Sequence, residues 1–142
     1  MSANPLQYIE DAVLAMPMAR TLGLRFTRLV PGEVEIELPV ADAFTFRPGQ
    51  LQATPVFAVA DFAAVSAAGS LLPRGWHNAT VDATLKLVAP AVGALLRARG
   101  RVVSAGKLLT VCAAEVFAVD EEGAETLCAA LLGSARNIKP PA

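Results

Sequence analysis

The sequence has few of the residues that metal sites and disulfide frameworks require. It contains one histidine and two cysteines in 142 residues. A metal site built from several imidazole or thiolate ligands is therefore not expected. Cys112 and Cys128 each lie in an apolar, strand-like stretch, so we interpret them as free buried thiols in a reducing compartment. A disulfide between them is the minor alternative.

Charge is also scarce. Charged residues make up 18% of the chain and the net charge is −1, which gives no electrostatic basis for binding nucleic acid. No apolar run reaches the roughly 18 residues of a membrane-spanning helix. Glu10 and Asp11 lie too early for a signal peptide. We therefore expect a cytoplasmic protein with neither a membrane nor a nucleic acid as partner.

Apolar residues are abundant instead, at 54% of the chain. A chain of this length can form one domain with a proper core, and we expect a single domain over residues 1–142. The apolar excess is more than a small monomer easily buries. It favours a homo-oligomer with an apolar interface.

The most informative stretch is 54–69, an alanine-rich run bounded by helix-end signals. Thr54 suits the N-cap, Pro55 the first helical position, and Gly69 a left-handed turn after the last one. Apolar residues surround this predicted helix, so we expect it to be buried on all sides. Asp61 is the exception. A buried carboxylate needs a hydrogen-bond partner, a proton or a wet cavity, which makes Asp61 a candidate functional residue.

The rest of the chain predicts one further helix and an antiparallel sheet. Residues 5–19 form an amphipathic pattern, and 136–142 are expected to be a frayed tail. In the strand 33–39, apolar residues alternate with glutamates, which predicts one wet face. A loop over 41–53 leads to the central helix, and four strands after it are expected to form a meander. The predicted strands are 24–30, 33–39, 78–88, 94–104, 108–119 and 125–134.

Three segments carry a family resemblance. Residues 60–64 are Ala-Asp-Phe-Ala-Ala, 80–90 are Thr-Val-Asp-Ala-Thr-Leu-Lys-Leu-Val-Ala-Pro, and 100–107 are Gly-Arg-Val-Val-Ser-Ala-Gly-Lys. In this order the chain, from about residue 23 to 133, resembles hotdog-fold acyl-CoA thioesterases of the phenylacetate-pathway (PaaI-like) type. The resemblance implies an α+β hotdog fold, in which an antiparallel sheet wraps around one long helix. It also implies an acyl-CoA substrate, no separate cofactor, and a homodimer or dimer of dimers with active sites shared between subunits.

The resemblance assigns roles to single residues. Asp61 matches the catalytic acid, which acts as general base or nucleophile on the thioester. Thr80 matches a hydroxyl that helps orient the attacking water, although a threonine in a strand is as often only a β-branched strand residue. Gly49 matches the loop glycine ahead of the helix. Val81, Gly106 and Lys107 lie in the shared motifs and are further substrate-binding candidates.

The loop before the helix departs from the family pattern. Gln52-Ala53-Thr54 replaces the common His-Gly-Gly, and Phe46 replaces an asparagine. Arg47-Pro48-Gly49 is nearer to a subset with an Arg-Pro-Gly loop. Backbone amides at the helix start can still bind a developing oxyanion, so the candidate donors are the amides of Ala53, Thr54 and Val56. The side chains of Gln50 and Gln52 are alternative donors.

Asp61 cannot serve the same carbonyl as the start of its own helix. About two turns, or roughly 10 Å, separate the two along the helix axis. A two-fold interface would bring Asp61 of one subunit to the helix start of the other. In apolar surroundings, the pKa of Asp61 is expected to be raised, which suits a base that works near neutrality.

Arg97, Arg99 and Arg101 share one face of a predicted strand. They are a candidate strip for the phosphates of coenzyme A, or simply a solvated face.

Three functions remain in competition. The first is an acyl-CoA thioesterase with Asp61 as base or nucleophile. The second is a non-catalytic protein that binds acyl-CoA or acyl chains, which the altered loop with Phe46 and Gln52-Ala53-Thr54 favours. A hotdog hydratase is third, because no histidine accompanies Asp61.

Overall fold

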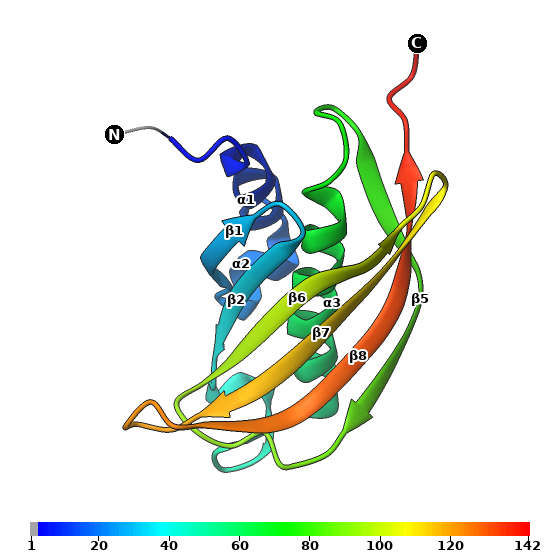
Figure 1. Ribbon diagram of the computed structural model, residues 1–142. Helices are drawn as coiled ribbons and strands as arrows, with labels where there is room; N and C mark the ends of the chain where they lie inside the picture. Colours follow the sequence, from blue (N-terminus) through cyan, green and yellow to red (C-terminus); the bar gives the residue numbers. More distant parts are fainter. Residues whose placement is uncertain (1–2) are drawn as a thin grey trace.

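The computed structural model describes residues 3–142, shown in Figure 1. Two helices come before the first strand in the chain, and a third, longer helix comes between the strands and packs against the sheet. The helices are α1 (Gln7–Leu14), α2 (Pro17–Leu22) and α3 (Ala53–Gly69), with a 3-10 turn η1 (Asp42–Phe44). The strands are β1 (Arg25–Val30), β2 (Glu33–Pro39), β3 (Thr45–Arg47), β4 (Gln50–Leu51), β5 (His77–Leu87), β6 (Leu95–Ala105), β7 (Leu109–Val119) and β8 (Glu125–Ile138).

Six strands form one antiparallel sheet in the order β1-β2-β6-β7-β8-β5, and β3 pairs with β4 in a separate hairpin. The α+β architecture, with a sheet curved around one long helix, confirms the predicted fold class. The predicted four-strand meander is wrong in one respect. Only β6, β7 and β8 follow one another across the sheet, because β5 pairs with β8 and lies at the far edge.

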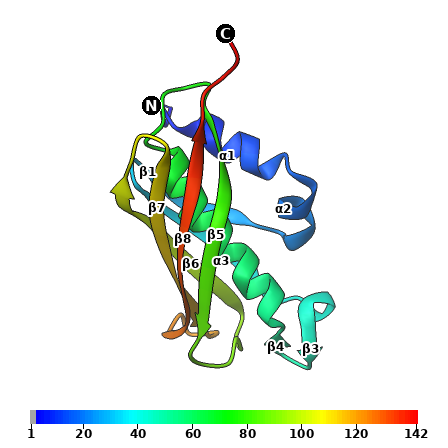
Figure 2. The same cartoon turned by 90° about the vertical axis from the view of Figure 1, so that its right-hand side faces the viewer.

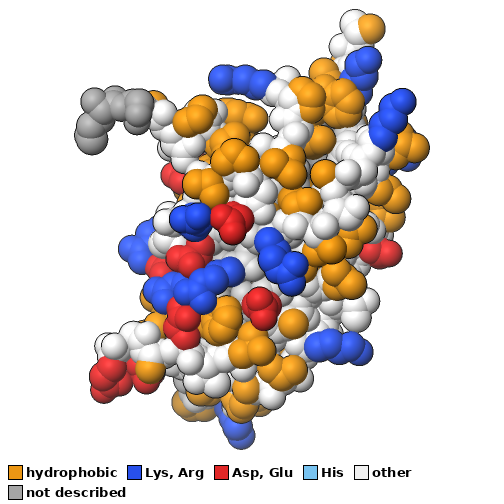
Figure 3. Space-filling model, viewed as in Figure 1, with side chains coloured by type: hydrophobic (Ala, Val, Ile, Leu, Met, Phe, Trp, Pro, Cys, Tyr) orange, Lys and Arg blue, Asp and Glu red, His pale blue; other side chains and the backbone are white. Residues whose placement is uncertain are grey.

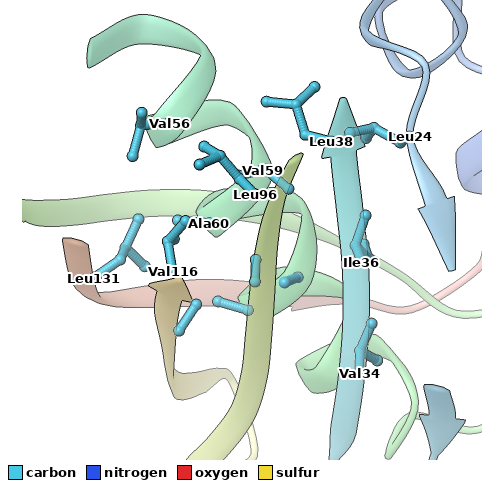
Figure 4. Close-up of a cluster of buried hydrophobic side chains, with 14 of the residues drawn as sticks. Leu24, Val34, Ile36, Leu38, Val56, Val59, Ala60, Leu96, Val116 and Leu131 are labelled. Carbon is cyan, nitrogen blue, oxygen red and sulfur yellow. The ribbon is translucent and has the colours of Figure 1, made fainter. Parts of the chain in front are cut away.

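The core lies between α3 and the concave face of the sheet. Figure 4 shows Val56, Val59 and Ala60 of α3 facing apolar side chains of the sheet, among them Ile36 and Leu96. The helix approaches β6 so closely that a Cβ at Gly100 would overlap the carbonyl oxygen of Ala63. Small residues on both elements therefore set the distance between helix and sheet.

The ends of α3 differ from their predictions. The helix begins at Ala53, one residue before the predicted N-cap Thr54, and Gln52 takes the N-cap position without a side-chain hydrogen bond. Gly69 is the last helical residue and is not left-handed. Here Gly69 makes room for Asn78, because a Cβ would lie 3.3 Å from Asn78 Nδ2. Proximity to β5, rather than a turn, favours glycine at this position.

The prediction that α3 is buried on all sides is also wrong. A single sheet covers only one side of a helix, and a stripe on the other side is half-buried or exposed. This stripe consists of Phe57, Ala58, Asp61, Phe62 and Val65. Asp61 therefore lies outside the core and is half-buried at the side of the helix.

The chain ends are also more structured than predicted. The helix predicted over 5–19 is divided into α1 and α2, because Pro17 starts a new helix at its first position. β8 continues to Ile138, so the predicted tail over 136–142 is partly a strand.

The glutamate face of β2 is not fully exposed to solvent, in contrast to the prediction from the sequence. Glu37 is 5% exposed and forms ion pairs with Arg25 and Arg97, the latter at 2.7 Å. On the outer face of the sheet, charged side chains gather over the side formed by β1, β2 and β6 (Figure 3). The pairing of β2 with β6 places glutamates opposite arginines, so the charges neutralise one another across strands.

Candidate active site

Asp61 lies in the middle of α3, on the stripe that the sheet leaves uncovered. The hydroxyl of Thr80, in the adjacent edge strand β5, donates a hydrogen bond of 2.9 Å to Asp61 Oδ1. A β-bulge between Thr80 and Asp82 interrupts the pairing of β5 with β8 at this point. Such bulges redirect side chains near functional sites. The two residues predicted to act together are thus in direct contact.

The surroundings of Asp61 change its acidity. Burial raises the pKa of the Asp61 carboxyl above its ordinary value of 3.8, and the hydrogen bond from Thr80 opposes this rise. The direction agrees with the prediction from sequence. A carboxylate in this setting is a stronger base than one in water. One of its oxygens accepts the hydrogen bond from the Thr80 hydroxyl.

A cavity of about 410 Å³ opens beside Asp61, which lies on its wall. Its size is in the range of about 300–1,000 Å³ that small-molecule sites occupy. The wall consists of α1 with Met16 after it, the C-terminal half of α3, and the segment from Leu72 to the first residues of β5. Figure 2 shows α1 beside this end of α3. The lining residues are mostly apolar and include Tyr8, Ile9, Met16, Phe62, Val65 and Trp76.

Sequence reasoning missed these apolar lining residues. The apolar stripe of α1 predicts a helix packed on the core, and such a stripe does not distinguish the core from the wall of a cavity. The Arg74 guanidinium lies 4.7 Å from the centroid of the Tyr8 ring and links α1 to the turn before β5.

The start of α3 carries a second hollow, of about 330 Å³, at the opposite end of the helix from α1. Phe46, Gln50 and Ala53 line it, together with Leu87 at the end of β5 and residues 88–91 after it. Gly49 adopts a positive φ of 78° in the turn between β3 and β4 (Figure 2), which explains the need for glycine there. The remaining predicted residues, Gln52 and Thr54, are exposed and are not part of the lining of this hollow.

Within one chain, the predicted site is therefore divided between two places. Asp61 and Thr80 lie at the first cavity, whereas the candidate oxyanion donor Ala53 lines the second hollow and Thr54 follows it in α3. Neither amide has a hydrogen-bond partner outside the helix within residues 3–142. Val81 is 58% exposed on the same edge strand as Thr80.

The structure does not support the predicted phosphate strip. Arg97 donates to Glu37 and Glu125, and Arg99 donates to Glu35 and Glu125, at 2.7–2.9 Å. Guanidiniums already paired with carboxylates are poor partners for a phosphate.

Arg101 is exposed on the same face. Gly106 and Lys107 form the exposed turn between β6 and β7, outside the linings of both hollows. Asn137 Nδ2 donates to both of their carbonyls, at 2.9 and 3.1 Å, and fastens the turn to β8.

The cysteines take no part in this site. Both are buried and free, and burial raises the pKa of each thiol to about 11. Within residues 3–142, no three side chains of histidine, cysteine, aspartate or glutamate are grouped so that they could hold a metal ion. None of the helices in this part of the chain is long and apolar enough to cross a membrane.

Solved structures resemble this chain closely. A thioesterase family protein from Silicibacter pomeroyi superposes with a TM-score of 0.89 at 32% identity, covering 93% of this chain and 96% of that one. A Haemophilus influenzae thioesterase gives a TM-score of 0.82 at 17% identity, covering 97% and 93% of the two chains. The Escherichia coli PaaI protein of the phenylacetic acid degradation operon gives a TM-score of 0.81 at 19% identity, covering 95% of this chain and 94% of that one.

The last two likenesses concern the fold alone. No model of a known protein family and no curated protein sequence matches the chain. The Silicibacter pomeroyi protein, by contrast, is similar in sequence as well as in structure over nearly the whole of both chains. The chain therefore belongs to the thioesterase family of the Silicibacter pomeroyi protein, and it shares the fold of the PaaI protein.

Proposed function

We propose that this protein is an acyl-CoA thioesterase that hydrolyses a thioester to a free acid and coenzyme A. The observation that carries the proposal is Asp61, a carboxylate of raised pKa on the wall of a largely apolar cavity, held by Thr80. Asp61 accepts a proton from water as the water attacks the thioester carbonyl. The thiolate of coenzyme A then leaves and takes up a proton.

The developing oxyanion needs donors that Asp61 and Thr80 do not supply. The backbone amides of Ala53 and Thr54 are free at the positive end of the α3 dipole, which suits a negative charge. Ala53 precedes Asp61 by eight residues, about 12 Å along the helix axis. The amides that stabilise the oxyanion therefore belong to the partner subunit in this proposal.

The edge strand β5 offers the interface for such a partner. It is eleven residues long and pairs only with β8 within residues 3–142. Apolar side chains are exposed along and after it, with Val81 at 58%, Leu87 at 54% and Val88 at 59%. A long, exposed edge with apolar side chains is a template for pairing with a second copy.

The positions of the two hollows agree with a two-fold axis near the middle of β5. The first cavity lies beside His77 and Thr80 at the start of β5, and the second hollow lies beside Leu87 at its end. Antiparallel pairing of two β5 strands would turn the second hollow of one subunit toward the first cavity of the other. A homodimer would therefore complete two identical sites.

The direct test is the substitution Asp61→Asn, which keeps the shape and the Thr80 contact but removes the base. We expect kcat for a panel of acyl-CoAs to fall by roughly 10²–10⁴-fold. Release of the free thiol of coenzyme A measures the rate, and size-exclusion chromatography checks that the assembly is unchanged. Equal turnover by wild-type protein and variant would refute the role of Asp61.

The same assay addresses a non-catalytic binding protein. The altered loop, with Phe46 55% exposed and Gln52-Ala53-Thr54 at the helix start, is the observation that favours this alternative. Tight binding of acyl-CoA by the wild-type protein without thiol release would support it over hydrolysis.

A further inference from the structure

The cavity beside Asp61 contains a buried hydroxyl that the proposed hydrolysis does not use. Ser66 lies on α3, is 7% exposed and lines the cavity. Within residues 3–142, the structure gives its side chain no hydrogen bond, and no fully sealed side-chain oxygen or nitrogen lacks a partner. The Ser66 hydroxyl is therefore in contact with the open space of the cavity.

The other polar side chains on the wall of α3 and β5 have partners or are open to solvent. Thr80 donates to Asp61, and Asn78 Nδ2 donates to the carbonyl oxygen of Val65 at 2.9 Å. His77 is exposed. Ser66 is thus a buried, unpaired hydroxyl among apolar neighbours, a position that favours a ligand carrying a hydrogen-bonding group.

We propose that Ser66 is a specificity-determining residue that selects acyl groups with a hydroxyl or carbonyl oxygen remote from the thioester. The inference rests on the proposed function, because it takes Asp61 as the place where the thioester reacts. Ser66 follows Asp61 by five residues, about 7.5 Å along the helix axis. The selected acyl group is therefore of medium length, largely apolar, and oxygenated toward its far end.

The experiment compares two ligands that differ only in this oxygen, hexanoyl-CoA and 6-hydroxyhexanoyl-CoA. Binding is measured to the Asp61→Asn protein, so that turnover does not interfere. Trp76, the only tryptophan of the chain, lines the cavity and reports binding through its fluorescence. We expect the hydroxylated ligand to bind about tenfold more tightly, and the preference to fall to about twofold or less when Ser66→Ala is added.

Ser70 provides a matched control on the same helix end. It is 6% exposed, but its hydroxyl donates to the Ala67 carbonyl at 2.6 Å and accepts from the Gly32 N–H at 2.7 Å. Ser70→Ala is therefore expected to lower the Tm and leave the tenfold preference intact. Ser66→Ala is expected to remove the preference with little loss of Tm.

The outcomes separate this inference from the proposed function. Equal affinity of the Asp61→Asn protein for both ligands, or a preference that survives Ser66→Ala, would overturn the role of Ser66 and leave the hydrolase proposal standing. Binding of neither ligand would overturn both.

Discussion

At the scale of single residues, the contact between Thr80 and Asp61 balances two requirements of a base. Burial raises the pKa of Asp61, and the hydrogen bond from the Thr80 hydroxyl stabilises the charged form and lowers it. The first effect makes the carboxylate more basic. The second favours the ionised form, which the proposed reaction requires. Removing the hydroxyl should therefore shift this balance in a known direction.

The substitution Thr80→Val removes the hydrogen bond at nearly constant shape. The pKa of Asp61 should then rise further. Because hydrolysis requires the ionised carboxylate, the acid limb of the kcat/KM profile should move to higher pH. The plateau rate should fall roughly tenfold with the loss of one hydrogen bond to a charged group. A pH profile of acyl-CoA hydrolysis measures both effects.

Thr80→Ser keeps the hydroxyl and serves as the control, with a profile close to that of the wild-type protein. An acid limb that stays in place in Thr80→Val would mean that the bond to Asp61 Oδ1 does not set the acidity of the base.

At the scale of elements, the ion pairs between β2, β6 and β8 hold the outer face of the sheet together. Burial raises the pKa of Glu37, but the hydrogen bonds from Arg25 and Arg97 outweigh it and leave the pKa below its ordinary value of 4.5. Arg97 and Arg99 both also reach Glu125. A carboxyl whose pKa is lowered by folding stabilises the folded state above the unfolded pKa, and this contribution is lost as pH falls through the folded one.

Glu37→Gln should therefore lower the free energy of unfolding by roughly 1.5–3 kcal/mol at neutral pH. The difference from wild type should shrink as pH falls below about 4.5, since the wild-type carboxyl then becomes protonated as well. Urea denaturation at neutral pH and at a pH below about 4.5 measures the difference in the free energy of unfolding. The matched control is Glu33→Gln, whose partner Arg28 is exposed, and the expected loss there is about 0–1 kcal/mol. Equal losses in the two variants would contradict a special role for buried Glu37.

Sequence periodicity predicted the individual strands well but not their surroundings. The alternation in β2 fixed which side chains face the core, and the observed bounds, Glu33–Pro39, agree with the prediction. It could not reveal that Glu37 is buried, because Arg25 and Arg97, which cover it, lie on the two neighbouring strands, and Arg97 is 60 residues away in the sequence. For the same reason, the apolar stripe of α1 did not predict a cavity wall. An apolar pattern in the sequence shows which face of a helix is apolar, but it does not show whether that face contacts the core or a cavity.

At the scale of the whole molecule, Asp61 was predictable because a lone acid in an alanine-rich helix is costly without a purpose. The separation of Asp61 from Ala53 followed from helix geometry alone. The position of β5 at the sheet edge could not be predicted, because local patterns do not determine which strands become neighbours. That edge is what gives the separated halves of the site a means to meet, through a second copy of the chain.

Mixed dimers would test whether each site is shared. Asp61→Asn subunits lack the base but keep the amides of α3. Ala53→Pro subunits keep Asp61 but lose one free amide, and the backbone of Gln52, with ψ at 159°, already suits a following proline.

Each variant alone should be weakly active. After unfolding and refolding of an equal mixture, half the dimers should be mixed with one intact site each, so activity should recover to about a quarter of wild type. Separate refolding of the two variants, followed by mixing without exchange, is the control. If the co-refolded mixture contains mixed dimers and remains as inactive as its components, each chain must complete its own site, and the shared-site proposal would be wrong.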